Sequence, residues 1–139
     1  MNLYKQFQTD KKLENEGVFI EYGPNSKDEP IRFRVARMGP SNLRYSKMME
    51  QRLKPYRRQI QTETIDSKLA DKMMLEIFVD TILLSWEGVE SEDGVKLEFN
   101  RETAIKLFTD LPDLYDDLRE QAGKAALFRA EINRVDAGN

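Results

Sequence analysis

The sequence predicts an α+β fold that is predominantly helical, with an N-terminal β-hairpin packed beside four or five helices in a single domain of 139 residues. Three observations predict it: an alternating apolar pattern before residue 38, apolar positions at helical spacing after it, and a length that suits one hydrophobic core. We divide residues 1–139 into a β-hairpin region (1–38), a helical region (39–135) and a tail (136–139) that is expected to fray.

Residues 17–23 and 31–37 are the predicted strands of the hairpin. Ile31, Phe33 and Val35 alternate with arginines, so one face of the second strand is apolar. The intervening residues 24–30 contain Pro24, Pro30 and polar residues that favour turns. Because an isolated hairpin is marginal in water, it must pack on the helices or pair with another chain.

The next segment predicts two helices. Ser41 or Asn42 can cap the first of them, and Pro55 predicts a kink or a division into two shorter helices. One apolar stripe follows this helix at spacings of four, four, three and four: Tyr45, Met49, Leu53, Tyr56 and Ile60. Residues 65–86 are apolar around much of a helical circumference, which predicts the central core helix.

The last third predicts a turn, a short extended piece and two helices. Asp93-Gly94 is the tightest point of the turn, and residues 95–99 alternate. Asn100 is the expected cap of a helix from residue 101 to about 109, and Asp110 the expected cap of the next, with Pro112 in its first turn. The inner face of that last helix is predicted to carry Leu114, Leu118, Ala122, Ala125 and either Phe128 or Ile132, with Gly123 weakening its middle.

The composition argues against an enzyme. The chain has neither His nor Cys, which removes most nucleophilic triads, zinc sites and thiol chemistry. We expect no catalytic residues, no metal and no cofactor. A net charge of -3 gives no global attraction to nucleic acid, and no apolar run approaches the roughly 20 residues of a membrane helix.

Residues 43–58 carry six basic residues and one acidic residue, a local net charge of +5. The ordinary interpretation is a solvated helix face; the functional one is contact with an acidic partner, with nucleic acid less favoured because no reading motif accompanies the charge. Met48 and Met49 could supply adaptable apolar contacts on this helix. The candidate protein-binding residues are therefore Arg44, Met48, Met49, Arg52, Tyr56, Arg57 and Arg58.

Residues 87–121 have the opposite character, with eleven acidic and four basic residues and a net charge of -7. They could complement the basic helix within the chain or join neighbouring subunits head to tail, and the sequence favours neither. Asp113, Asp116 and Asp117 are assigned to the first turns of a helix, where its dipole favours negative charge, rather than to a metal site.

Several motifs in the second half resemble the tail assembly chaperones of long-tailed bacteriophages (siphophages). In order, they are Leu83-Leu84-Ser85-Trp86-Glu87-Gly88-Val89, Glu92-Asp93-Gly94, Leu97-Glu98-Phe99, Asn100-Arg101-Glu102 and Leu111-Pro112-Asp113-Leu114. In that family a helix ends in an apolar segment with Trp, an acidic turn follows, and an extended piece leads into a capped helix. The resemblance covers about residues 70–128, and the order of the motifs carries it.

This resemblance implies a function and partners. Such a protein binds the tape measure protein, keeps it soluble, helps recruit tail tube subunits and tends to form homo-oligomers. It is expected in the host cell cytoplasm and not in the mature virion. Two alternatives remain open: a head–tail joining or minor tail protein of the virion, and a small nucleic-acid-binding regulator that uses Arg44, Arg52, Arg57 and Arg58.

Overall fold

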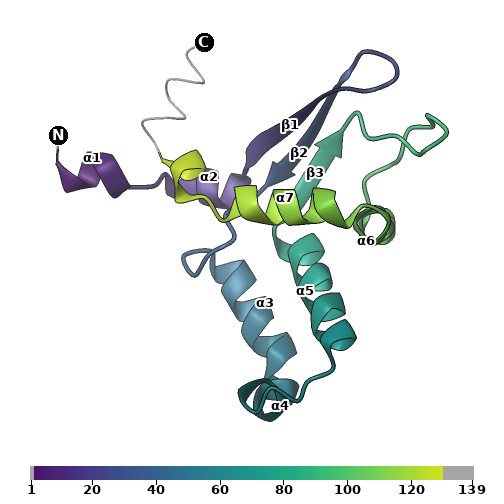
Figure 1. The fold of residues 1–139 in the computed structure, drawn as a ribbon. Helices are drawn as coiled ribbons and strands as arrows, with labels where there is room; N and C mark the ends of the chain where they lie inside the picture. Colours follow the sequence, from purple (N-terminus) through teal and green to yellow (C-terminus); the bar gives the residue numbers. More distant parts are fainter. Residues whose placement is uncertain (1, 130–139) are drawn as a thin grey trace.

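The computed structural model describes residues 2–129 and confirms an α+β fold dominated by helices (Figure 1). Its elements, in order, are α1 (Leu3–Phe7), α2 (Lys11–Glu16), β1 (Val18–Pro24), β2 (Pro30–Val35), α3 (Leu43–Leu53), the 3-10 helix η1 (Lys54–Tyr56), α4 (Arg57–Gln61), α5 (Ser67–Thr81), β3 (Leu83–Glu87), α6 (Arg101–Asp110), α7 (Pro112–Ala122) and the 3-10 helix η2 (Ala125–Phe128). In Figure 1, α3 and α5 form an arm that extends from the sheet, with α4 at its far end.

The predicted hairpin is present. β1 and β2 pair antiparallel, with Val18 opposite Val35 and Ile20 opposite Phe33, so these four side chains share the face that packs on the core. The opposite face carries Phe19, which is half exposed. The alternation of apolar and charged residues along β2 therefore separates the core face from the solvent face.

The expectation that the core helix continues to Trp86 is wrong, because α5 ends at Thr81 and residues 83–87 form the strand β3. β3 pairs antiparallel with β2 and completes a sheet of order β1-β2-β3. An irregularity in the register leaves Leu84 as an extra residue, so that Leu83 and Trp86 both face the core although they are three residues apart. That spacing suits a helix as well as a bulged strand, which explains the error.

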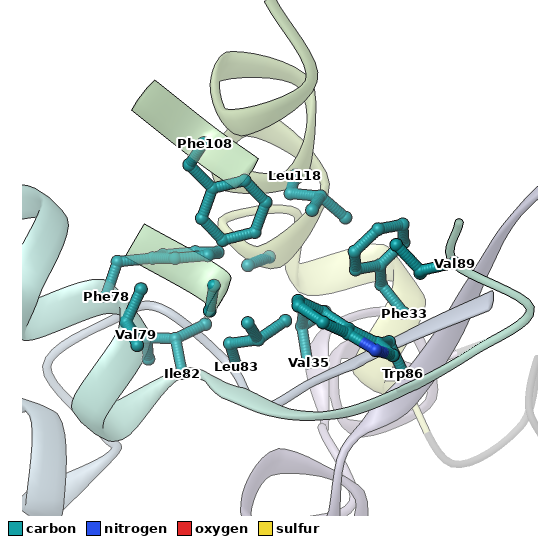
Figure 2. Close-up of a cluster of buried hydrophobic side chains, with 12 residues drawn as sticks. Phe33, Val35, Phe78, Val79, Ile82, Leu83, Trp86, Val89, Phe108 and Leu118 are labelled. Carbon is teal, nitrogen blue, oxygen red and sulfur yellow. The ribbon is translucent and has the colours of Figure 1, made fainter. Parts of the chain in front are cut away.

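The core lies between the inner face of the sheet, the end of α5, and the helices α6 and α7 (Figure 2). Aromatic rings meet edge to face at its centre, with centroids 5.9 Å apart for Phe33–Trp86 and 6.0 Å apart for Phe78–Phe108. The indole Nε1 of Trp86 donates a hydrogen bond of 2.9 Å to the carbonyl oxygen of Leu97. Trp86 therefore anchors the loop after β3 to the core.

The helix ends test the predicted caps. Asn42 and Asn100 cap α3 and α6 as expected, by accepting from the backbone N–H groups of Tyr45 and Thr103. Pro55 lies in η1, between α3 and α4, which confirms the predicted division of that helix.

Three expectations for the last helices are wrong. Asp110 ends α6 and accepts a hydrogen bond of 2.6 Å from Lys106, while Leu111 stands at the N-cap of α7 without a side-chain cap. Pro112 at the first position of α7 has no N–H, which leaves one fewer backbone donor without a partner at this helix end. Gly123 ends α7 at its C-cap rather than weakening its middle. Ala125 and Phe128, which were expected on the same helix, therefore lie in η2 instead. Ile132 and residues 136–139 lie outside the described part of the chain.

The helices α1 and α2, which precede the hairpin, were not among the predicted elements. The side chain of Glu14 in α2 is buried and accepts hydrogen bonds from Thr9 and from Ser41 (2.5 Å), with Arg37 at 3.4 Å. Burial raises the pKa of Glu14, but these hydrogen bonds and the charge of Arg37 outweigh it and hold the pKa below its usual value. Glu14 thus fixes α2 against the segment that connects β2 to α3.

Candidate functional site

The helix α3 has two differently used faces. Arg44, Met48 and Arg52 follow each other at spacings of four, so they share one side of the helix. That side faces α5: an Nη of Arg44 donates to the backbone carbonyl of Asp80 at 2.9 Å, and an Nη of Arg52 lies 2.6 Å from its carboxylate. Arg44 and Arg52 are therefore engaged within the chain.

Asp80 is the centre of an ion-pair network that joins three helices. Its carboxylate lies 2.6 Å from Arg52 of α3 and 2.8 Å from Arg101 of α6, and Glu76 lies 3.7 and 3.9 Å from the same two guanidinium groups. Burial raises the pKa of Asp80, but the hydrogen bonds and charges of Arg101 and Arg52 outweigh it, so its pKa lies below the usual range. The carboxylate thus stays ionised and holds the arm against α6.

A second face of α3 lines an open groove, which we call the α3 groove. Its apolar lining comes from the loop before α3, from α3 and from α4: Met38, Pro40, Tyr45, Met49, Leu53 and Ile60. The groove has a volume of about 600 Å³. It forms because the break at Pro55 turns α4 across the end of α3, which places Ile60 on the same surface as Met49.

The margin of the α3 groove is charged. Lys54 and Arg57 lie along it, together with Glu50, and all three side chains are exposed. Tyr45 closes its inner wall, where burial raises the pKa of the phenol despite the nearby charge of Arg119. The arrangement presents an apolar surface with a mainly basic margin, which suits an amphipathic segment that carries carboxylates.

The structure brings together two of the seven predicted contact residues, since Met49 and Arg57 both line the α3 groove. Tyr56 and Arg58 are close in sequence but do not line it, and Met48 lies on the side of the helix that faces α5. The apolar groove residues missing from the predicted set are Met38, Pro40, Tyr45, Leu53 and Ile60. Three of these five belong to the apolar stripe at helical spacing, which was the signal that could have identified them.

The structure also bears on the charge asymmetry. Within residues 2–129, no ion pair joins the basic residues 43–58 to the acidic residues 87–121; the acids that meet Arg52 are Glu76 and Asp80 of α5.

In the same described range, no group of three or more acidic side chains is arranged to hold a metal ion. No helix there is both long enough and apolar enough to cross a membrane.

Comparison with known proteins gives one result. The family described as YdaY prophage protein matches residues 40–139, which is most of the chain and includes α3, the core helices and the α3 groove apart from Met38 and Gly39. No curated protein and no solved structure matches the chain. The match spans well over half of the sequence, and the chain therefore belongs to the YdaY prophage protein family and is phage-derived.

Proposed function

We propose that this prophage protein is a tail assembly chaperone, which binds an extended helical client in the α3 groove. The client proposed is the tape measure protein, kept soluble until tail tube subunits gather around it. The observation that carries the proposal is the groove itself: an apolar surface that two helices and a loop present to solvent. Contiguous exposed apolar surfaces with polar margins are typical of protein-binding sites.

The lining of the groove fits a client that offers many similar segments. Met38 and Met49 have flexible thioether side chains, which repack around apolar side chains of different shape. A long helical client presents its apolar residues at spacings of three and four, and a groove of this kind accepts such a stripe without a unique sequence. Reversible cover of successive stripes would prevent the client from aggregating.

The margin of the groove supplies orientation. The side chains of Lys54 and Arg57 lie at the exposed edge, where they can pair with carboxylates on the polar side of the client. Such pairs at a solvated edge contribute more to the rate and direction of encounter than to affinity. Arg52, which is held by Asp80, is not needed for this step.

Coexpression with the tape measure protein of the same prophage tests the proposal. The soluble fraction of the client is expected to rise with this chain present, and to fall again with Met49→Asp or Arg57→Glu. Arg58→Glu is the matched control, since it makes the same charge change at the next residue but outside the groove. A client that is equally soluble with and without the chain contradicts the chaperone function.

Two further measurements separate the proposal from its alternatives. Mass spectrometry of purified particles should not find the chain, whereas a head–tail joining or minor tail protein would be present in stoichiometric amounts. An electrophoretic mobility shift of DNA or RNA at low salt should be absent, because a regulator that uses the basic residues would bind most strongly there.

A further inference from the structure

The short helix α1 exposes apolar side chains at one end of the molecule. Leu3, Tyr4 and Phe7 are 70%, 76% and 64% exposed, and their spacing places them on one side of the helix. The guanidinium of Arg129 lies 5.5 Å from the centre of the Phe7 ring, yet the ring stays mostly in solvent. Because a helix of five residues is marginal by itself in water, a second surface is needed to stabilise it.

A cleft of matching character lies between the loop after β3 and the helix α6. Its volume is about 780 Å³, and it has an apolar floor of Leu97, Leu107 and Leu111, the last of which is 49% exposed. Four carboxylates and one ammonium group line the rest: Glu90, Glu92, Asp93, Asp110 and Lys106. We call this surface the acidic cleft.

The carboxylates of the acidic cleft are not all satisfied within the described residues. Glu90 accepts hydrogen bonds from Ser26, and Asp110 accepts one from Lys106. Between residues 2 and 129, neither Glu92 nor Asp93 has an ion pair or a side-chain hydrogen bond. Two exposed carboxylates thus stand beside an apolar floor, and the ammonium group of Lys106 in this cleft is paired with Asp110.

The charge of α1 is the opposite. The helix contains Lys5 and no acidic residue, and α2 adds the exposed Lys11 and Lys12, with Glu14 buried and Glu16 as its exposed acid. An apolar helix with these cations suits the acidic cleft and is poorly matched to the α3 groove, whose margin already carries Lys54 and Arg57. Charge therefore favours the acidic cleft over the α3 groove as the docking surface of α1.

The acidic cleft that receives α1 cannot be the one in the same chain. In Figure 1, α1 lies at the opposite end of the molecule from α6 and the loop after β3. Three residues, Gln8, Thr9 and Asp10, connect α1 to α2. α2 is fixed by Glu14 and by a hydrogen bond of 2.7 Å from the backbone N–H of Asp10 to the carbonyl of Phe128. So short a connection does not let α1 cross the domain.

We propose that α1 of one copy docks in the acidic cleft of a second copy. Leu3, Tyr4 and Phe7 then cover the apolar floor, and Lys5 meets Glu92 and Asp93. Because the donor and acceptor surfaces are different and lie at opposite ends of each copy, the contact is head to tail and can propagate. The proposal is independent of the proposed function, since it uses neither the α3 groove nor a client.

Analytical ultracentrifugation of the full chain from low to high micromolar concentration tests this contact. The wild type is expected to form concentration-dependent oligomers, and Phe7→Asp or Leu111→Lys to weaken them by about tenfold or more. Phe19→Asp is the matched control, because Phe19 is also half exposed and apolar but belongs to neither surface. Circular dichroism checks that each variant is folded.

Two designs with paired variants make the test specific. Mixing Phe7→Asp with Leu111→Lys restores one good surface from each, so a discrete one-to-one complex should form although neither variant assembles alone. Lys5→Glu and Glu92→Lys should each weaken assembly, and the double variant should recover it. A wild type that remains monomeric at every concentration, or a Phe19→Asp variant as defective as Phe7→Asp, would overturn the proposal.

Discussion

Replacing Asp80 with Asn tests how the arm of α3 and α5 is fixed to the domain. The variant keeps the shape of the side chain but removes the charge that meets Arg52 at 2.6 Å and Arg101 at 2.8 Å. A hydrogen bond between charged groups contributes about 1.5–3 kcal/mol when shielded, and an exposed ion pair at most about 1 kcal/mol. The ion pair of Arg52 with Asp80 is shielded, because the two side chains are only 30% and 15% exposed. The Arg101 side chain is 53% exposed, so solvent screens its ion pair with Asp80.

We therefore expect Asp80→Asn to lower the free energy of unfolding by about 2–3 kcal/mol, which corresponds to a fall in Tm of roughly 6–12 °C for a domain of this size. Urea denaturation followed by circular dichroism measures the change. The control is Asp110→Asn, which removes an ion pair with Lys106 whose side chains are both mostly exposed, so its urea midpoint should stay close to that of the wild type. If the two variants lose the same stability, the reasoning about Asp80 is wrong.

The stability difference between the wild type and Asp80→Asn should also depend on pH. The folded-state pKa of Asp80 is lowered, so its contribution is fully present above its unfolded-state pKa of about 3.9 and is lost as the pH falls through the folded-state pKa. The difference in stability between the wild type and Asp80→Asn should therefore shrink as the pH falls from about 5 towards 2. A difference that stays constant over that range would exclude the ion pair as its cause.

Three further substitutions test the turn after β3 and the core. Gly88 has φ +71°, and a Cβ there would lie 2.3 Å from the carbonyl oxygen of Pro30, so Gly88→Ala should lose at least about 3 kcal/mol of stability. Gly94 has φ +79° but open surroundings, so Gly94→Ala should lose about 1–2 kcal/mol; equal losses in thermal unfolding would contradict the close approach at Gly88. Trp86→Phe removes the hydrogen bond that anchors the loop, so the variant should lose about 1–2 kcal/mol of stability. Circular dichroism measures the unfolding, because Trp86 is the single tryptophan and its fluorescence is lost in the variant. An unchanged urea midpoint would show that the hydrogen bond contributes nothing to stability.

Local chemistry allowed much of the fold to be predicted from the sequence. The hairpin follows from the alternation at Ile31, Phe33 and Val35, because a strand turns successive side chains to opposite faces. Asn42 and Asn100 begin helices because their short side chains satisfy backbone N–H groups a few residues away. Each of these signals acts within a few residues, so no distant contact is needed to read it.

The features that were missed depend on contacts between distant segments. Residues 82–86 have an apolar pattern that suits a helix or a bulged strand. They form the strand because the edge of β2 offers unpaired backbone groups with which β3 pairs. The candidate site was likewise predictable only where it depends on local spacing, and not where it depends on contacts between distant segments. Helical spacing identifies the stripe that contains Met49, but only the packing of α5, with Asp80 beside Arg52, determines which side of α3 is covered and which is open to a partner. Periodicity defines the faces of a helix, and the tertiary structure assigns their neighbours, because an ion pair between helices forms only once folding has brought them together.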